Sequence, residues 1–179
     1  MNRKTFLRNS SIGATILLIP GLSGLTRAAD RNNNSSTPKI VREDRGKVLN
    51  VIGDIQTHKL SGTDTGNQIV EWVDNVEPGV GIPPHVHTRE DEIFRVIWGE
   101  IELMIDGKVT VLKAGDTAFA PKNVSHAWKV AGTEKARMIT SAFPSGIKDM
   151  FEELAQLPPG PPDFEKVTEI CGRYGVEFV

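Results

Sequence analysis

The sequence has little of several features that would point to particular classes of protein. A single cysteine, Cys171, among 179 residues excludes a framework of internal disulfides. It lies in a helical pattern with no histidine nearby in sequence, so we interpret it as a buried structural thiol. Basic and acidic residues nearly balance (21 against 23) and no basic block occurs, so nothing favours nucleic acid or an anionic membrane as a partner.

What remains is typical of a globular protein. The chain is 39% hydrophobic and 25% charged, and its length allows one domain with a hydrophobic core. The longest apolar run, residues 12–22, is interrupted by Gly and Pro and is too short for a comfortable transmembrane span. These features predict one folded domain stabilised by packing or by a bound metal.

The first 29 residues have the pattern of an export signal peptide. Arg3 and Lys4 precede the apolar run, and small residues at 26–28 offer a cleavage site. The order resembles a twin-arginine signal, but Lys4 stands where the second arginine belongs, so the Sec route stays open. We predict export to the periplasm and no membrane contact after signal removal. The alternative is a cytoplasmic protein with an irregular N-terminus.

Beyond the signal, the composition divides the chain into three further parts. Residues 30–39 are polar and low in complexity, which predicts a flexible linker. Residues 40–145 are predicted to form a β-barrel, and residues 146–179 a C-terminal helical extension.

Short alternating segments separated by turns fill the barrel region and indicate a β-sandwich or barrel. Asp106-Gly107 is a strong signal for a two-residue hairpin. No segment with helical periodicity is found between residues 40 and 143. The predicted strands are 48–52, 55–60, 68–76, the histidine segment before Glu92, 93–98, 101–105, 109–111, 117–120, 127–130 and 136–143.

The tail has a different pattern. Residues 147–157 have apolar positions at helical spacing, a proline-rich break follows, and Asp163 can cap a second helix. We expect these helices to pack outside the barrel, at a subunit contact, with no direct part in chemistry.

The strongest functional signal is the grouping of three of the four histidines. His85 and His87 are two residues apart in a predicted strand, so their side chains point to the same face. Glu92 can return to that point after a bend at 88–91, and His126 follows downstream. Imidazoles and a carboxylate together suit a divalent first-row transition metal.

These residues resemble the two motifs of the cupin family. The first motif matches at every spacing, whereas the second has Asn123 in place of a glycine and Val130 in place of an asparagine. Asn tolerates the left-handed backbone conformation that the turn needs, and Val130 is not at a ligand position. The matching positions are Gly79, His85, His87, Glu92 and Gly99 in the first motif, and Gly115, Pro121 and His126 in the second.

The resemblance implies an all-β fold, a double-stranded β-helix (jelly-roll barrel), here with short C-terminal helices. It implies one divalent metal ion, held by His85, His87, Glu92 and His126, and a homodimer. The sequence leaves the metal open among Fe, Mn, Ni, Co, Cu and Zn.

Four protein ligands leave coordination positions for a small-molecule substrate. The chain looks similar to quercetinase-like cupins, which implies a dioxygenase acting on a phenolic or enolic molecule, with Glu92 as a catalytic proton acceptor. One alternative is a redox-neutral isomerase, epimerase or decarboxylase. It would need polar side chains inside the barrel, and the identifiable inward positions are mostly apolar. The other is a non-catalytic small-molecule-binding cupin.

Strand periodicity also suggests residues for the wall of a substrate pocket. Phe94 shares the face of Glu92, and Trp128 shares the face of His126. Met104 and Phe119 are further candidates for this wall. His58 lies outside both motifs and is predicted at the surface or at the edge of the core.

Overall fold

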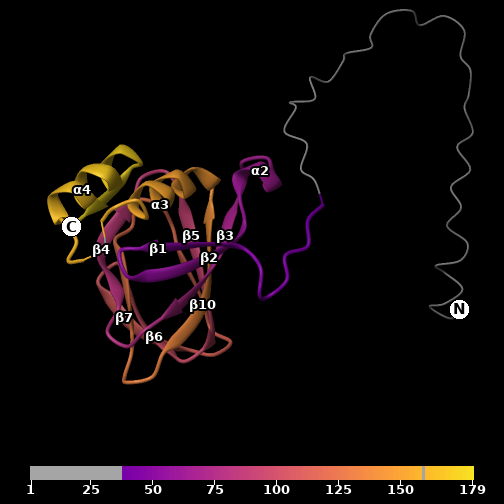
Figure 1. Cartoon of the computed structure of the whole chain (residues 1–179). Coiled ribbons are helices and arrows are strands. Elements are labelled where there is room, and N and C mark those ends of the chain that lie inside the picture. The colour runs from indigo at the N-terminus through magenta and orange to yellow at the C-terminus, as the bar shows by residue number, and fades with distance from the viewer. Residues whose placement is uncertain (1–37, 159) are drawn as a thin grey trace, which may run out of the picture. The chain divides into compact units, whose positions relative to one another are not determined.

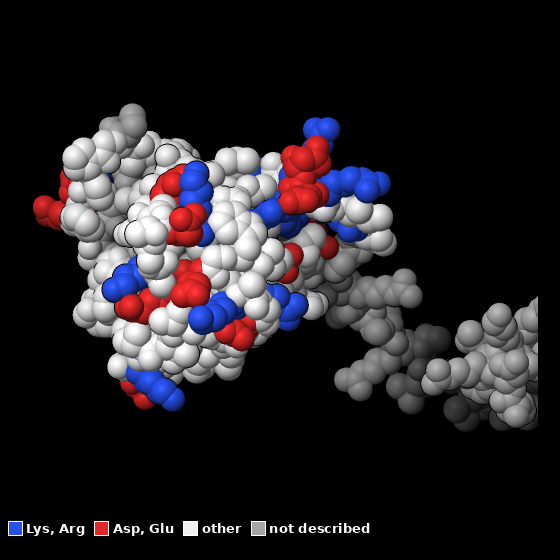
Figure 2. Space-filling model, turned by 90° about the horizontal axis from the view of Figure 1, so that it is seen from below, with Lys and Arg blue, Asp and Glu red and all other residues white. Residues whose placement is uncertain are grey.

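A computed structural model describes residues 38–158 and 160–179. The predicted signal peptide and most of the predicted linker lie outside these residues. Within them, no helix is long and apolar enough to cross a membrane. The face of the molecule seen in Figure 2 carries acidic and basic side chains interspersed with one another.

Two antiparallel sheets form the body of the molecule (Figure 1). The larger sheet has the order β1-β2-β3-β10-β5-β8, with strands at Lys47–Val51, Asp54–Leu60, Val70–Val76, Ala136–Phe143, Asp91–Trp98 and Thr117–Ala120. The smaller sheet has the order β11-β4-β9-β6-β7, with strands at Val176–Phe178, Gly81–His87, His126–Val130, Glu100–Ile105 and Lys108–Lys113. The predicted jelly-roll fold is therefore confirmed, and every predicted strand is present.

Alternation of side chains places the core between the sheets. On β6, Ile101 and Leu103 are buried while Glu102 and Met104 between them are not. The hairpin between β6 and β7 turns at Asp106 and Gly107, both with positive φ (51° and 74°), as a tight two-residue turn requires. This turn fixes the register of the two strands.

The short tail helices are present at the predicted places. A 3₁₀ turn at Ser145–Ile147 leads into α3 (Lys148–Leu154), and α4 covers Phe164–Arg173. The carboxylate of Asp163 accepts hydrogen bonds from the backbone N–H groups of Glu165 and Lys166, which confirms it as the cap of α4.

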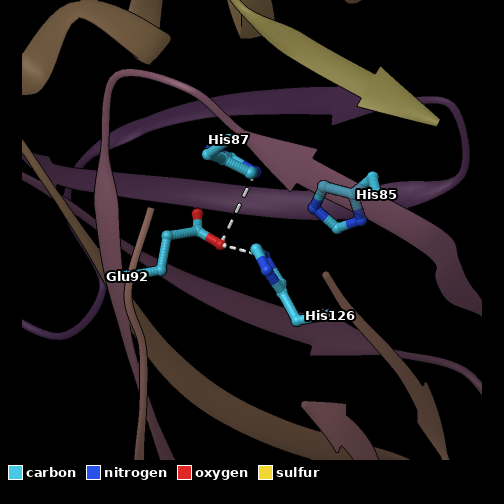
Figure 3. A group of neighbouring side chains, drawn as sticks. All are labelled: His85, His87, Glu92 and His126. Carbon is cyan, nitrogen blue, oxygen red and sulfur yellow. Dashed lines mark hydrogen bonds and ion pairs between the residues drawn. The ribbon is translucent and has the colours of Figure 1, made fainter. Parts of the chain in front are cut away.

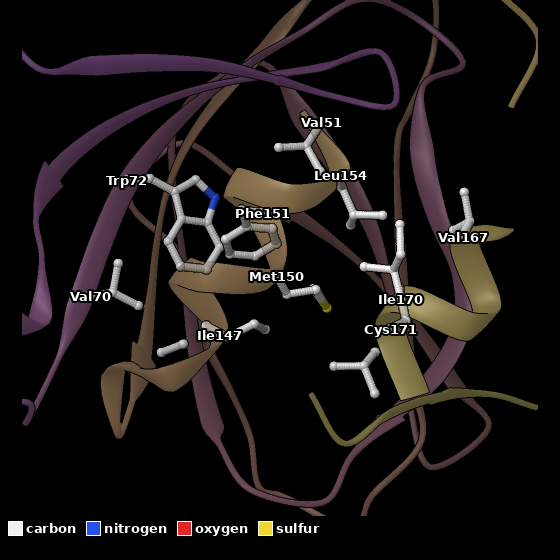
Figure 4. Close-up of a cluster of buried hydrophobic side chains, with 12 residues drawn as sticks. Val51, Val70, Trp72, Ile147, Met150, Phe151, Leu154, Val167, Ile170 and Cys171 are labelled. Atoms are coloured by element: carbon white, nitrogen blue, oxygen red, sulfur yellow. The ribbon is translucent and has the colours of Figure 1, made fainter. Parts of the chain in front are cut away.

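The prediction that the tail packs outside the barrel is wrong. Side chains of α3 and α4 join β3 in a shared buried cluster (Figure 4), in which the rings of Trp72 and Phe151 lie 4.9 Å apart in an edge-to-face arrangement. After α4 the chain forms β11, which pairs with β4 so that Val176 is opposite His87 and Phe178 is opposite His85. Three residues are too few for alternation to show, so the sequence pattern did not reveal this strand.

A second correction concerns α2, a single helical turn at Gly62–Thr65 in a region predicted to contain no helix. Ser61 and Asp64 form a capping box, in which the Asp64 carboxylate accepts a hydrogen bond of 2.9 Å from the backbone N–H of Ser61. One turn stabilised by its own cap needs no apolar face, and it therefore leaves no periodic signal.

Candidate metal centre

Four buried side chains from three strands converge at one point between the sheets (Figure 3). His85 and His87 come from β4 and His126 from β9 in the smaller sheet, whereas Glu92 comes from β5 in the larger one. His85 and His126 are direct partners in the β4–β9 pairing. One ligand atom from each residue lies within 4.8 Å of all the others. The residues that sequence analysis selected as metal ligands are thus brought together.

Backbone carbonyls fix the rings of two of the histidines. Nδ1 of His85 lies 2.8 Å from the carbonyl oxygen of Pro83, and Nδ1 of His126 lies 3.1 Å from that of Val124. A carbonyl can only accept, so Nδ1 is protonated in both rings. Nε2 is therefore the nitrogen of each ring that can become a metal ligand.

The third histidine, His87, has no such contact with a backbone carbonyl in the part of the chain that the structure describes. Beside it lies a residue that sequence analysis missed. Nδ1 of His87 has no hydrogen-bond partner among the described residues, and neither has Oε2 of Glu90; these two buried atoms lie 4.0 Å apart. Burial raises the pKa of Glu90 to about 7, with the Arg89 charge opposing and the Glu92 charge adding to the rise. Glu90 lies in the turn between β4 and β5, where the sequence indicated only a bend.

The protonation states of the group follow from burial and from the charge of Glu92. Burial lowers the pKa of His85 to about 4 and lowers that of His87, so both rings are neutral at pH 7. Burial alone would raise the pKa of Glu92, but the imidazoles of His87 and His126 hold it below its usual range. Glu92 is therefore an anion although it is buried.

His126 is the exception among the histidines. Burial favours its neutral form, yet the hydrogen bond to Glu92 (Nε2 to Oε2, 3.1 Å) raises its pKa above the ordinary value. A metal ion at this point would take the place of the proton between these two atoms. Three neutral imidazole nitrogens and one carboxylate oxygen are then available, so the donor set fits a divalent transition metal.

The group opens onto a cavity of about 80 Å³. Since a cavity needs roughly 10–15 Å³ to hold one water, this one has room for a small molecule. Phe94 and Trp128 line it, as their strand positions predicted. The tail lines it too, through Met150 and Phe151 of α3 and other buried residues, so the C-terminal segment forms part of the cavity wall.

Two of the predicted pocket residues lie elsewhere. Met104 faces outward from β6 and lines a separate, more open groove. None of the four candidate metal ligands lines that groove. Phe119 is 53% exposed, and its ring stacks on that of Phe143 on the outside of the larger sheet. Both lie one residue out of phase with the buried positions of their strands, so they point away from the cavity. His58, in contrast, is buried and stacks on Trp72 at the edge of the core.

One wall of the cavity is polar, and sequence analysis missed it. Along β2, the buried side chains are Asp54, Gln56 and His58, while Ile55 between them is exposed. The strand thus has its polar residues inside, the reverse of the ordinary pattern. Asp54, Gln56, Asp74 and Thr140 all line the cavity. The only sequence signal was the alternation itself, with Asp, Gln and His on one face.

Comparisons with known proteins agree with this fold. The model of the cupin domain family matches residues 72–142. An uncharacterized protein of Aquifex aeolicus is 32% identical over 91 residues, a match that covers 51% of this chain and 68% of that one. The pectin degradation protein KdgF of Dickeya dadantii is 29% identical over 89 residues, covering 46% and 79% of the two chains.

A solved structure, that of KdgF from Halomonas sp., superposes with a TM-score of 0.54 at 22% identity and covers 60% of this chain and 94% of that one. This likeness supports the fold. The chain belongs to the cupin superfamily, and it carries a group of residues, three His and one Glu, that could hold a metal ion.

Proposed function

We propose that this protein is a metal-dependent cupin oxidoreductase of the dioxygenase type that acts on a small phenolic or enolic molecule. The observation that carries the proposal is the convergence of His85, His87, Glu92 and His126 beside a cavity whose wall includes the first three of them. An ion held there would retain open coordination positions for substrate oxygens and would supply Lewis-acid and redox chemistry.

The residues of the chain have separate tasks in this proposal. Nδ1 hydrogen bonds orient the rings of His85 and His126 before any ligand arrives. Glu92, kept anionic by its imidazole neighbours, accepts the proton of the substrate hydroxyl. Phe94 and Trp128 give the cavity apolar aromatic walls suited to a flat ring, and they exclude water from it.

A second candidate is a redox-neutral enzyme, an isomerase, epimerase or decarboxylase acting on a small polar molecule. The polar wall formed by Asp54, Gln56, Asp74 and Thr140 favours it, because the expectation of a mostly apolar interior is wrong on this side of the cavity. Similarity to a pectin degradation protein also favours a polar substrate.

Oxygen uptake separates the two candidates. We would load the protein in turn with Fe(II), Mn(II), Ni(II), Co(II) and Cu(II), and offer catechols, flavonols and 1,3-diketones in an oxygen electrode. The proposal predicts one O₂ consumed per product molecule, with uptake lost in Glu92→Gln and retained in Glu177→Gln, a matched change at an exposed position. Turnover of a polar substrate without oxygen uptake would favour the second candidate. Uptake that persists in Glu92→Gln would contradict the assigned base.

Two further parts of the proposal concern assembly and location. We propose a homodimer, to be tested by light scattering on the purified chain. We also propose periplasmic export directed by residues 1–29, which fractionation of cells expressing the full chain would test against a variant lacking those residues.

A further inference from the structure

The polar wall of the cavity contains a pair of buried carboxyl groups, Asp54 and Asp74. They come from neighbouring strands, β2 and β3, and are 1% and 0% exposed. Burial raises the pKa of both carboxyl groups, and the charge of Asp54 adds to the rise at Asp74. Two neighbouring buried carboxyl groups do not both ionise readily, which favours a single negative charge on the pair.

Asp74 is fully engaged with its neighbours. Its Oδ1 accepts a hydrogen bond of 2.6 Å from Nε1 of Trp72, and its Oδ2 accepts one of 2.7 Å from Oγ1 of Thr140. Burial, followed by the charge of Asp54, raises its pKa well above the usual range, which makes Asp74 the member that holds the proton.

Within the described ranges of the chain, only one carboxylate oxygen of Asp54 has a hydrogen-bond partner. Its Oδ2 accepts a hydrogen bond of 2.9 Å from Nε2 of Gln56, whose Oε1 lies 3.0 Å from Nε2 of His58. Its Oδ1 accepts no hydrogen bond from an N–H or hydroxyl donor of the described residues. An ionised carboxylate has about four lone-pair sites, so accepting capacity remains at this atom.

A buried acceptor without a donor costs free energy unless a ligand or water supplies the donor. Asp54 lines the same cavity as His85, His87 and Glu92. In the larger sheet, β3 and β10 lie between its strand, β2, and the strand of Glu92, β5. The cavity therefore has a group of candidate metal ligands on one wall and an unsatisfied hydrogen-bond acceptor on another.

We infer that Asp54 Oδ1 is a substrate-recognition site that accepts a hydrogen bond from a hydroxyl group remote from the oxygens bound at the histidine end. The inference rests on the proposed function in one respect: the other end of the substrate is taken to bind through its oxygens at the metal site. It narrows the substrate class to small phenolic or enolic molecules that carry an additional hydroxyl. Asp74, Gln56 and Thr140 hold the carboxylate in place and are positioning residues.

Binding of paired probes tests this inference. The hydroxyl probes are catechols with a terminal hydroxyl on an arm of zero, one or two carbons, and in each matched analogue a methyl group replaces that hydroxyl. Affinities would be measured by calorimetry, without oxygen, on protein loaded with redox-inert Zn(II). We expect at least one hydroxyl probe to bind about tenfold more tightly than its methyl analogue, because a hydrogen bond to a charged acceptor is lost in the analogue.

Asp54→Asn should abolish that preference. The side-chain oxygen of Asn would face the Gln56 donor, so an NH₂ donor would replace the acceptor that faces the cavity. Asp149→Asn, the same change at an exposed position of α3, should retain the preference. A preference that survives in Asp54→Asn would overturn the inference.

The wild-type protein decides the matter if Asp54→Asn does not fold. Equal affinity for every hydroxyl and methyl pair in the wild type would overturn the inference by itself. Unsubstituted catechol has no additional hydroxyl group, so its affinity measures binding at the metal site alone. Catechol binding without a hydroxyl preference would therefore reject this inference and keep the proposed function, whereas a hydroxyl preference without oxygen uptake would reject the oxidoreductase assignment and keep the recognition site.

Discussion

Buried carboxyl groups on two walls of one cavity have pKa values shifted in opposite directions. At the histidine wall, Glu92 is surrounded by imidazoles, and its pKa is held below the usual range although burial opposes this. At the polar wall, Asp54 and Asp74 have each other as neighbours, and burial raises the pKa of both. Neighbouring groups, more than burial itself, therefore decide whether an interior carboxylate is charged.

The same comparison gives the two walls different purposes. Glu92 and its three imidazoles form a set of electron-pair donors that a cation would satisfy. Burial and the charge of Asp54 favour the protonated form of Asp74, and the two carboxyl groups accept hydrogen bonds from Gln56, Trp72 and Thr140. The Asp54–Asp74 pair can therefore recognise a neutral hydrogen-bond donor without a metal.

The largest expected effect is on the histidine wall. Adding Zn(II) at about 1,000 times its dissociation constant should stabilise the wild type against unfolding by about 4 kcal/mol, and removing a ligand should abolish the gain. Thermal or denaturant unfolding of His126→Ala with and without metal measures this. His58→Gln, a change in the histidine outside the group, serves as the control and should keep the gain. A full metal-dependent gain in His126→Ala would show that His126 is not a metal ligand.

A smaller effect is expected at Glu90. Its carboxylate faces the unpartnered Nδ1 of His87 at 4.0 Å, and a carboxylate beside a metal-bound imidazole increases the basicity of that ligand. We expect Glu90→Gln to weaken metal affinity by about tenfold in a competition titration with a chelator. Glu177→Gln, at an exposed position of the neighbouring strand β11, should leave the affinity unchanged. Equal affinities for wild type and Glu90→Gln would show that His87 needs no such support.

The polar wall should give a pH dependence of stability. A carboxyl whose pKa is raised in the folded state binds more protons there than in the unfolded chain, so its contribution is present below the unfolded pKa and is lost as pH rises through the folded pKa. Each unit of elevation corresponds to about 1.4 kcal/mol. Asp74→Asn removes this titration.

The test is the difference in unfolding free energy between Asp74→Asn and wild type, measured with EDTA at pH 5 and pH 8. Glu90, His58 and His85 also titrate with shifted pKa values, but they are common to both proteins and cancel in the difference. The unfolding free energy of Asp74→Asn should increase relative to that of the wild type as the pH rises. A difference that does not change with pH would mean that Asp74 is not protonated in the folded protein.

The smallest effect is expected outside the cavity. Phe119 is half-exposed and stacks on Phe143, so Phe119→Ala should cost about 1 kcal/mol of stability and leave metal content and probe binding unchanged. Phe94→Ala is the matched change inside the core, where the loss should be about 3–5 kcal/mol. A clear loss of probe affinity in Phe119→Ala would show that the cavity extends to the outer face of the sheet.

Three ligands of the histidine wall could be predicted because their information is local, whereas His126, 34 residues after Glu92, was predicted from the resemblance to the second cupin motif. His85 and His87 are two residues apart, Glu92 follows one turn later, and the spacing alone places all three side chains together. Phe94 and Trp128 followed from the same two-residue period. Met104 and Phe119 failed because that period depends on knowing which residue of a strand points inward, and each was placed on the wrong face.

The polar wall could not be predicted, because it breaks the assumption that apolar residues point inward. Asp54 and Gln56 are buried on β2 while Ile55 is exposed. Glu90 was invisible for a related reason, since a turn glutamate is ordinarily solvated. The tail was misplaced because β11 is defined by its pairing with β4, a contact between residues about 90 positions apart in sequence.

We propose that His85, His87, Glu92 and His126 hold one metal ion. The direct test is elemental analysis of the protein purified from its own compartment, beside His126→Ala prepared in the same way. We expect about one divalent transition metal per wild-type chain and almost none in the variant. Wild-type protein without metal, or a variant with as much metal as the wild type, would contradict it.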